Sequence, residues 1–271
     1  MNGITSLLKR ELANKKRKSP LLMTHVVLGY PSLSASVSLV KAMIDGGASF
    51  VELQIPFSDP MADGPTIMAA NEAALAQGLT VRDCFRAAEQ LTAQRDVPIL
   101  FMSYANILMQ YGPSSKGVAH FCRDAATAGV AGMIVPDIPP EENSEGYWTH
   151  SHAYGVLPIP IVSPLSSAER LSKIASVAGD GFVYCVSTTG TTGERSALPT
   201  GLGPYLKRVK QKLKQPLAVG FGISTAEQVR ALSAHADIAI VGSAMLNLIN
   251  RTAPGKRAKA VRSFTEALCN A

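Results

Sequence analysis

The sequence predicts a single α/β domain: a (β/α)8 TIM barrel with an extra helix at its N-terminus. Eight short apolar segments recur along the 271 residues, and most are followed by turn-forming residues and an amphipathic helical stretch. Barrels of this kind reach this length as one domain, and no linker or change in composition divides the chain. We therefore expect one barrel domain over residues 1–271.

The expected elements follow in order along the chain. Residues 3–16 place four apolar side chains on one face and predict an amphipathic first helix. The segments expected to form strands start about 20–50 residues apart, as βα units require. They cover residues 22–28, 50–55, 98–103, 131–135, 157–162, 181–186, 217–222 and 237–242. Amphipathic helices are expected at residues 34–43, 80–91, 117–128, 168–178, 202–213 and 226–234.

A doubly wound open sheet is the main alternative fold for alternating strands and helices. A dinucleotide-binding sheet of that type normally carries a GxGxxG loop after its first strand. Here the first strand leads into Gly29-Tyr30-Pro31-Ser32, which lacks that spacing. The barrel is therefore favoured.

Composition excludes several classes of protein. Apolar residues make up 46% of the chain and charged residues 17%, which predicts a large buried core and argues against disorder. No apolar run approaches the ~18 residues that span a bilayer, and the N-terminal segment lacks the apolar region of a secretory signal. The 4 cysteines are widely spaced without a CxxC pair, which indicates reduced thiols in a cytoplasmic protein.

Charge and histidine spacing favour neither nucleic-acid nor metal binding. The net charge is +6, and the dense basic run at residues 15–18 has no interleaved aromatic residues. A solvated helix end explains that run. His150 and His152 have no further ligands nearby in the sequence, so we expect no metal site. The basic balance also suits a small anionic substrate.

Residues 50–65, FVELQIPFSDPMADGP, join a strand to a semi-rigid loop. Alternating apolar residues predict a strand whose Glu52 faces away from the apolar set. The loop that follows is rich in proline and aspartate, so it cannot continue the strand or start a helix before Pro65. We expect it to carry Asp63 back over the end of the strand.

Each of these carboxylates has a simpler explanation when taken alone. A glutamate in a strand commonly faces solvent or pairs with lysine, and an aspartate in such a loop commonly forms a turn. In a barrel, however, active sites lie at the C-terminal ends of strands, where Glu52 and Asp63 both fall. Desolvation in the lumen would favour neutral Glu52 and suit it to exchange a proton, whereas Asp63, nearer solvent, is expected to stay ionised.

Glycine-bearing loops follow the last three predicted strands, at residues 187–193, 220–224 and 241–244. Many barrels bind phosphate with the loops after strands seven and eight and a helix N-terminus. Gly222, Gly242 and Ser243 occupy those positions. Glycine can also simply end a strand, but three neighbouring loops favour an anion site. The residues thus predict a barrel enzyme that acts on a phosphorylated small molecule by proton transfer.

The stretch ELQIPFSDPMADGP closely resembles the signature of the tryptophan synthase alpha chain family. Its PFSDPxADGP core is highly specific. Further matching motifs follow in the family's order along nearly the whole chain: LGYP at residues 28–31, MSYAN at 102–106, VPDIP at 135–139, TTG at 191–193, GFGIS at 220–224 and VGSA at 241–244.

This resemblance implies a carbon–carbon lyase of tryptophan biosynthesis that cleaves indole-3-glycerol phosphate to indole and glyceraldehyde 3-phosphate. By matching position, Glu52 would be the general acid/base, and Asp63 would accept a hydrogen bond from the indole N–H. Thr192 would close a loop over Asp63. The substrate-binding residues implied by the resemblance are Tyr104, Tyr184, Thr192, Gly193, Phe221, Gly222, Gly242 and Ser243.

The resemblance also implies a partner. No cofactor is expected in this chain, whereas a beta chain would carry pyridoxal phosphate in an α2β2 heterotetramer. The docking face would include Asn106 and Pro139, with Asp59 and Pro60 exposed on the rigid loop. A function of a different class, a binding and regulatory subunit with weak activity of its own, stays open at this point.

Several positions depart from the family pattern. Gln54 stands where glycine is frequent and would add an amide to the lumen near Glu52. His25 and Val27 replace an expected phenylalanine and threonine, and residues 187–189 lack an expected arginine. The loop at residues 187–196 is expected to be mobile until a ligand or partner closes it.

Another phosphate-binding barrel is the main alternative enzyme, such as indole-3-glycerol phosphate synthase or a phosphosugar isomerase. The synthase and many sugar-phosphate barrels rely on a catalytic lysine on a strand, and none of the predicted strands contains one. Cys185 has no charged neighbour in sequence that would activate it as a nucleophile. The residues therefore favour the lyase.

Overall fold

The computed structural model describes residues 2–14, 17, 19–113, 116–186, 201–220 and 222–271. Within these residues, parallel strands form a nine-stranded sheet in the order β5-β4-β3-β2-β1-β9-β8-β7-β6. The strands are β1 (Leu21–Val27), β2 (Phe50–Gln54), β3 (Ile99–Met102), β4 (Gly132–Ile134), β5 (Leu157–Pro158), β6 (Ile161–Val162), β7 (Val183–Val186), β8 (Leu217–Gly220) and β9 (Ile238–Val241).

The barrel closes through the segment at residues 157–162, where a single strand was predicted. The structure divides it into β5 and β6, which are the two ends of the sheet. Between them, the N–H of Ile159 donates to the carbonyl of Met133 on β4 at 2.8 Å, and the carbonyl of Pro160 accepts from Tyr184 on β7 at 2.9 Å. Proline lacks an N–H, which interrupts the ladder. The segment nevertheless joins both edges, and the predicted barrel is confirmed.

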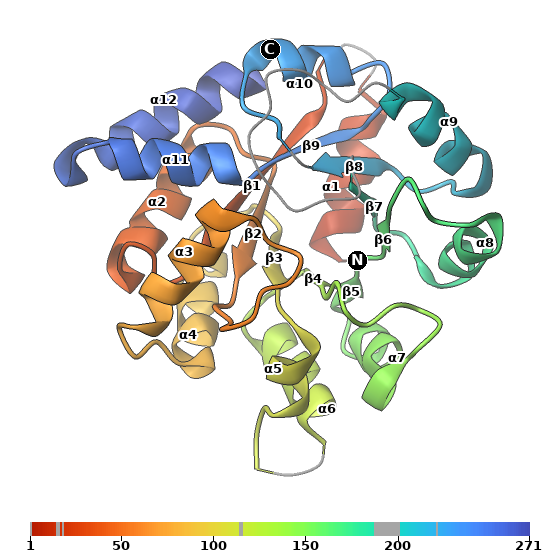
Figure 1. The fold of residues 1–271 in the computed structure, drawn as a ribbon, viewed down its shortest axis with the longest axis horizontal. Helices are drawn as coiled ribbons and strands as arrows, with labels where there is room; N and C mark the ends of the chain where they lie inside the picture. Colours follow the sequence, from red (N-terminus) through yellow and green to blue (C-terminus); the bar gives the residue numbers. More distant parts are fainter. Residues whose placement is uncertain (1, 15–16, 18, 114–115, 187–200, 221) are drawn as a thin grey trace.

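Helices surround the strands in Figure 1, and after α1 most of the strands are followed in sequence by one or more of them. Those in the described residues are α1 (Gly3–Leu12), α2 (Leu33–Asp45), α3 (Pro65–Leu75), α4 (Val81–Thr92), α5 (Ala105–Met109), α6 (Gly117–Thr127), α7 (Tyr147–Ala153), α8 (Ala168–Val177), α9 (Leu202–Lys212), α10 (Ala226–Leu232), α11 (Ser243–Arg251) and α12 (Arg257–Cys269). Short 3-10 turns lie at η1 (Ser144–Gly146) and η2 (Pro254–Lys256).

Local sequence signals explain where several helices begin and end. Thr80 and Asp83 form a capping box at the start of α4. Helix α3 begins at Pro65, since the missing N–H of proline costs nothing at the first helical position. Helix α1 ends at Leu12 instead of residue 16, because no large apolar residue follows to extend its buried face.

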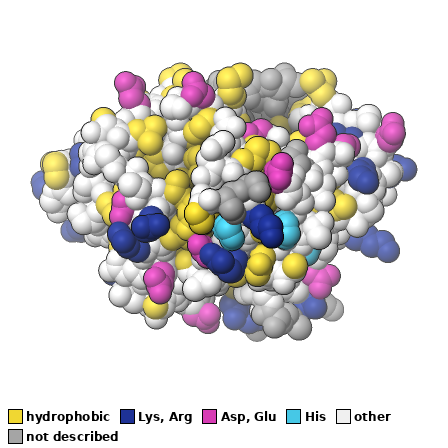
Figure 2. All heavy atoms as spheres, turned by 90° about the horizontal axis from the view of Figure 1, so that it is seen from below, with side chains coloured by type: hydrophobic (Ala, Val, Ile, Leu, Met, Phe, Trp, Pro, Cys, Tyr) yellow, Lys and Arg dark blue, Asp and Glu magenta, His cyan; other side chains and the backbone are white. Residues whose placement is uncertain are grey.

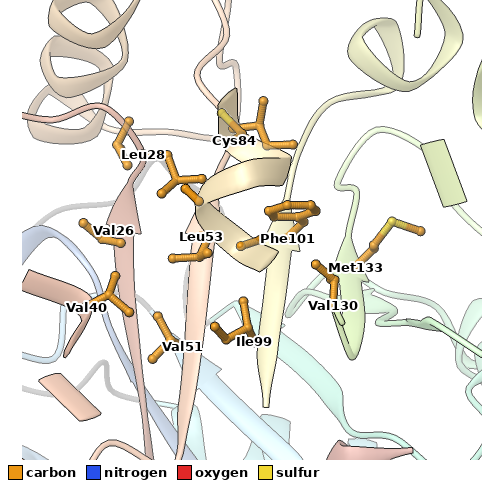
Figure 3. Close-up of a cluster of buried hydrophobic side chains, with 14 of the residues drawn as sticks. Val26, Leu28, Val40, Val51, Leu53, Cys84, Ile99, Phe101, Val130 and Met133 are labelled. Atoms are coloured by element: carbon orange, nitrogen blue, oxygen red, sulfur yellow. The ribbon is translucent and has the colours of Figure 1, made fainter. Parts of the chain in front are cut away.

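Apolar residues on the outer face of the strands pack against the surrounding helices (Figure 3). Val51 and Leu53 of β2 lie beside Ile99 and Phe101 of β3, and Cys84 of α4 joins the same buried cluster. This arrangement confirms that the apolar set of β2 faces outward. The remaining side chains of β2 consequently face the lumen.

Helix α1 covers the N-terminal end of the barrel. Its Ile4 is fully buried in the lumen cluster with Phe50 and Phe182, whose ring centroids are 5.7 Å apart. The side chain of Asn2 donates to the carbonyls of Ala131 and Gly155 at 2.7 and 2.8 Å, just before β4 and β5 begin. With this end closed by apolar contacts, the C-terminal ends of the strands are left to form a site.

The molecular surface carries mixed charge. On the face seen in Figure 2, lysine and arginine side chains are interspersed with acidic, histidine and apolar ones. None of the helices described has the length and apolar character needed to cross a membrane. Nor do the described side chains include a group of three or more His, Cys, Asp or Glu placed to hold a metal ion.

Candidate active site

A cavity lies at the C-terminal ends of the strands, where the sequence predicted the site. Six of the predicted residues line it: Glu52, Asp63, Tyr184, Gly222, Gly242 and Ser243. A seventh, Tyr104, contacts Asp63 from β3's end. The other three, Thr192, Gly193 and Phe221, lie outside the described residues, as does the predicted mobile loop at residues 187–196.

Glu52 enters the cavity from β2 and is paired with His25 of β1. The two residues are direct partners in the parallel register, so both side chains project into the lumen at one level. His25 Nδ1 lies 3.2 Å from Glu52 Oε1, and the side chains are only 7% and 3% exposed. The second carboxylate oxygen, Oε2, has no hydrogen-bond partner among the described residues. Oε2 is therefore the carboxylate oxygen of Glu52 that the described residues leave unbonded.

The charge state of His25 depends on its acidic neighbours. Burial alone lowers the pKa of His25, but the adjacent Glu52, through its charge and hydrogen bond, and the charge of Asp63 outweigh that effect. The net pKa is raised, and the Gln54 amide acts in the same direction. The pair therefore favours an imidazolium next to a carboxylate.

Asp63 is held over the end of β2 by two donors. The side-chain amide of Gln54 donates to Asp63 Oδ2 at 2.6 Å, and the Tyr104 hydroxyl donates to the same oxygen at 3.2 Å. The loop itself is fixed by Asn71 of α3, whose side chain accepts from the N–H of Phe57 at 3.0 Å. Asp63 thus returns over the strand, as the Pro-rich loop predicted.

The expectation that Asp63 lies nearer solvent than Glu52 is wrong. Asp63 is 4% exposed, close to the burial of Glu52. Burial raises the pKa of Asp63, and the charge of Glu52 adds to the rise. His25, Gln54 and Tyr104 act against this rise but do not cancel it. The two carboxylates therefore share one desolvated environment. His25, Gln54 and Tyr104 favour the ionised form of Asp63 there.

Tyr184 borders the same cavity from β7. Gly220 on the neighbouring strand makes room for it, because a Cβ there would lie 2.7 Å from the Tyr184 hydroxyl oxygen. Burial raises the pKa of Tyr184 well above its usual value, and the charges of Glu52 and Asp63 reinforce the rise. The hydroxyl stays protonated and can act as a donor.

The glycine-bearing part of the cavity lining has the features of an anion site. Gly222 has φ +85°, a conformation open to glycine and strained for other residues. Gly242 precedes α11, and its carbonyl accepts from the N–H groups of Met245 and Leu246 at 2.9 and 3.2 Å. The N–H groups of Ser243 and Ala244 come before these bonds, in the first turn, where a helix can bind an anion.

The residues predicted to dock the partner differ in their exposure to solvent. Asp59 and Asn106 are exposed and Pro139 is half-buried, but Pro60 is buried in this chain, contrary to the prediction. The exposed apolar residue of this loop is the neighbouring Met61, at 87%. The chain buries the proline because the loop folds back over Tyr104, whose hydroxyl accepts from the N–H of Ala62 at 3.2 Å.

His25 is the site residue that sequence reasoning missed. In the sequence it stands out only as a departure from the family pattern, although it faces the lumen beside the residue expected to be the acid/base. Alternation along β1 could have placed it on the lumen side. The register that sets it opposite Glu52 arises from strand pairing, which one sequence does not specify.

Together, the fold and the site define a (β/α)8-barrel enzyme whose cavity is lined by a buried carboxylate pair and by a helix N-terminus. The family model for the tryptophan synthase alpha chain matches residues 12–270. The chain belongs to the tryptophan synthase alpha chain family.

Similarity to individual relatives extends over nearly the whole chain. A tryptophan synthase alpha chain from Desulfotalea psychrophila is 43% identical over 254 residues, which cover 94% of this chain and 96% of the relative. The crystal structure of tryptophan synthase subunit alpha from Legionella pneumophila superposes with a TM-score of 0.88 at 34% identity, covering 100% of this chain and 98% of the other. Mycobacterium tuberculosis tryptophan synthase gives a TM-score of 0.86 at 33% identity, covering 98% and 96%.

Proposed function

We propose that this chain cleaves indole-3-glycerol phosphate to indole and glyceraldehyde 3-phosphate in tryptophan biosynthesis, as an aldolase-type carbon–carbon lyase. Membership of the alpha chain family supports this reaction. The observation that carries the proposal is that Glu52 and Asp63 line the same cavity as the N-terminus of α11. A substrate that carries both a phosphate and a carbon centre that must gain a proton fits that arrangement.

Glu52 is the group through which the proton passes. The reaction breaks the bond between indole C3 and the adjacent glycerol carbon, whose hydroxyl becomes the aldehyde carbonyl. One proton moves from that hydroxyl to C3, and the electrons of the broken bond restore the indole ring. Glu52 can serve both parts of this transfer because it is buried, borders the cavity and keeps Oε2 without a partner among the described residues.

Asp63 is assigned to the indole nitrogen. Protonation of C3 places positive charge on the ring, and a carboxylate that accepts a hydrogen bond from the N–H stabilises it. Gln54 and Tyr104 both donate to Oδ2, so we assign Oδ1 to the substrate. In a desolvated site this fixed charge acts more strongly than it does in water.

The phosphate is assigned to Gly222, Gly242 and Ser243, with Tyr184 beside the indole. Gly222 lets the backbone come close to the phosphate, and the first turn of α11 presents N–H groups to it. Thr192, Gly193 and Phe221 are assigned to substrate binding and loop closure on the family relationship alone.

We further propose that the chain works with a beta chain that binds pyridoxal phosphate, in an α2β2 assembly, while the alpha chain itself uses no cofactor. Exposed Asp59 and Met61 on the loop after β2 and exposed Asn106 on α5 offer a docking face beside the cavity. The loop that would contact the partner also carries Asp63, so docking can adjust the site directly.

The reaction is tested by incubating the purified chain with indole-3-glycerol phosphate and measuring indole by chromatography, alone and with a beta chain. Indole release in either condition supports the proposal, and its absence in both excludes the lyase. A rate that rises on adding the beta chain supports the coupled subunit. An unchanged rate leaves a lyase that works alone and excludes coupling.

A further inference from the structure

His25 has the position of a residue that serves the reaction. It lines the cavity, is 5% exposed and contacts Glu52 through one ring nitrogen. Its other ring nitrogen, Nε2, has no hydrogen-bond partner among the described residues. A buried imidazole left half-partnered is costly unless a neighbouring charge or a ligand compensates for it.

The groups that face His25 come from three sides. Glu52 projects from β2 and Asp63 from the loop after it, and both carry negative charge when ionised. On the side of β9, Gly242 lies next to His25 and carries no charge: a Cβ added at Gly242 would lie 3.5 Å from the His25 Cβ. Tyr184, across the lumen, interacts with the same two carboxylates and stays neutral. The acidic neighbours thus make a cation at His25 favourable.

We propose that His25 is a positioning residue for the lyase reaction: it fixes the orientation of Glu52 through Oε1 and places a positive charge beside it. The remaining oxygen, Oε2, takes the proton of the substrate hydroxyl and delivers it to C3. The O–H bond of the hydroxyl and the bond between C3 and the glycerol carbon break. The C3–H bond and the aldehyde C=O form, the electrons of the broken C–C bond return to the ring, and Glu52 ends as the carboxylate in which it began. This role rests on the proposed function, whereas the His25–Glu52 coupling itself can be measured without substrate.

The coupling is tested first by NMR titration of the histidine side chains. The chain has 5 histidines, and the His25 signal is the one that disappears in His25→Phe. Replacing Glu52 by glutamine should lower the His25 pKa by about one unit or more, since a neighbouring opposite charge shifts a pKa by that order. Glu89→Gln, at an exposed position on α4, is the matched control and should leave it unchanged. An identical His25 titration in Glu52→Gln would overturn the coupling.

The role in turnover is tested by kcat/KM for indole release across pH in the wild type, His25→Phe and His25→Asn. In His25→Phe the acid limb should move up by about one pH unit, because a buried carboxylate without its cation protonates more readily. The fall at high pH, where wild-type His25 loses its proton, should be absent. His25→Asn keeps a donor for Oε1, so its kcat should recover towards wild type while its acid limb stays raised.

The outcomes separate this inference from the proposed function. If the wild type releases no indole, the lyase proposal fails and the NMR titration alone decides the coupling. If both His25 variants keep the wild-type acid and basic limbs, the positioning role is excluded even where the lyase is real. If His25→Phe fails to fold, His25→Asn and the Glu52→Gln titration still give the decision.

Discussion

The side-chain amide of Gln54 donates to Asp63 Oδ2 at 2.6 Å, with both residues buried. This contact ties the last residue of β2 to the loop that returns over it. Tyr104 donates to the same oxygen from the end of β3, at the longer distance of 3.2 Å. A single carboxylate oxygen is thus held from two strands, which leaves the orientation of Asp63 largely fixed before substrate arrives.

The two donors should differ in their contribution to turnover. Gln54→Leu removes the shorter bond to a charged acceptor and should lower kcat by about tenfold or more, given ~1.5–3 kcal/mol for such a bond. Tyr104→Phe removes the longer bond and should lower kcat less. Steady-state kinetics of indole release measure both. Gln90→Leu, exposed on α4, is the control. A larger loss in Tyr104→Phe would contradict this order.

The two carboxylates should be needed for chemistry more than for binding. Glu52→Gln keeps the shape of the side chain and removes its proton transfer, so kcat should fall by about 10²–10⁴-fold. Asp63→Asn should also lower kcat, because the charge that stabilises the cationic ring is lost.

Binding of the phosphate end should change little in either variant, since Ser243 and Gly222 are untouched. Isothermal titration with glyceraldehyde 3-phosphate checks this, with Glu89→Gln as the matched control for turnover. Near-native kcat in Glu52→Gln would show that the acid/base assignment is wrong.

The barrel and the lumen side of β2 could be predicted because both follow from periodicity. The alternation of apolar residues in β2 placed Glu52 inward. The composition of the following loop excluded a helix before Pro65, where α3 begins. The division of residues 157–162 into two strands depended on Ile159 bonding to β4 while Pro160 accepts from β7. That is a property of barrel closure, which local pattern does not contain.

The burial of Asp63 and the role of His25 were beyond prediction for a related reason. Whether a loop carboxylate is desolvated depends on what packs over it, and Tyr104 and Gln54 reach it only in the folded barrel. His25 and Glu52 are 27 positions apart in the sequence numbering and meet through the β1–β2 register. Neighbours across strands are set by pairing, so a single sequence leaves them open.

Replacing Gly222 should weaken phosphate binding in addition to destabilising the fold through backbone strain. Gly222→Ala forces an L-residue to φ +85°, at a cost of about 1–2 kcal/mol. It should raise KM for indole-3-glycerol phosphate, since the loop must shift away from the anion.

Gly78→Ala is the matched control, because Gly78 has φ +74° with nothing within 4 Å of an added Cβ. It should lose a similar amount of stability in urea denaturation and keep its KM. An equal rise of KM in both variants would show that the effect is general destabilisation and would sink the specific role of Gly222.

Stability should depend on pH through His25, with a defined sign. The folded-state pKa of His25 is raised above the ordinary value of 6.5. The folded chain therefore binds this proton more tightly than the unfolded chain does. The stabilisation is fully present below pH ~6.5 and is lost as pH rises through the folded pKa. His25→Asn cannot titrate and lacks this contribution at every pH.

The measurement is the free energy of unfolding in urea, for wild type and His25→Asn, at intervals from pH 6 to pH 9. The difference between the two curves reports His25 together with its coupling to Glu52 and Asp63, which remain in both proteins. That difference should shrink as pH rises, by at most about 1.4 kcal/mol per pH unit for one proton. Parallel curves over this window would mean that folding leaves the proton affinity of His25 unchanged. A difference that grows with pH would mean that burial, which lowers its pKa, outweighs the two carboxylates.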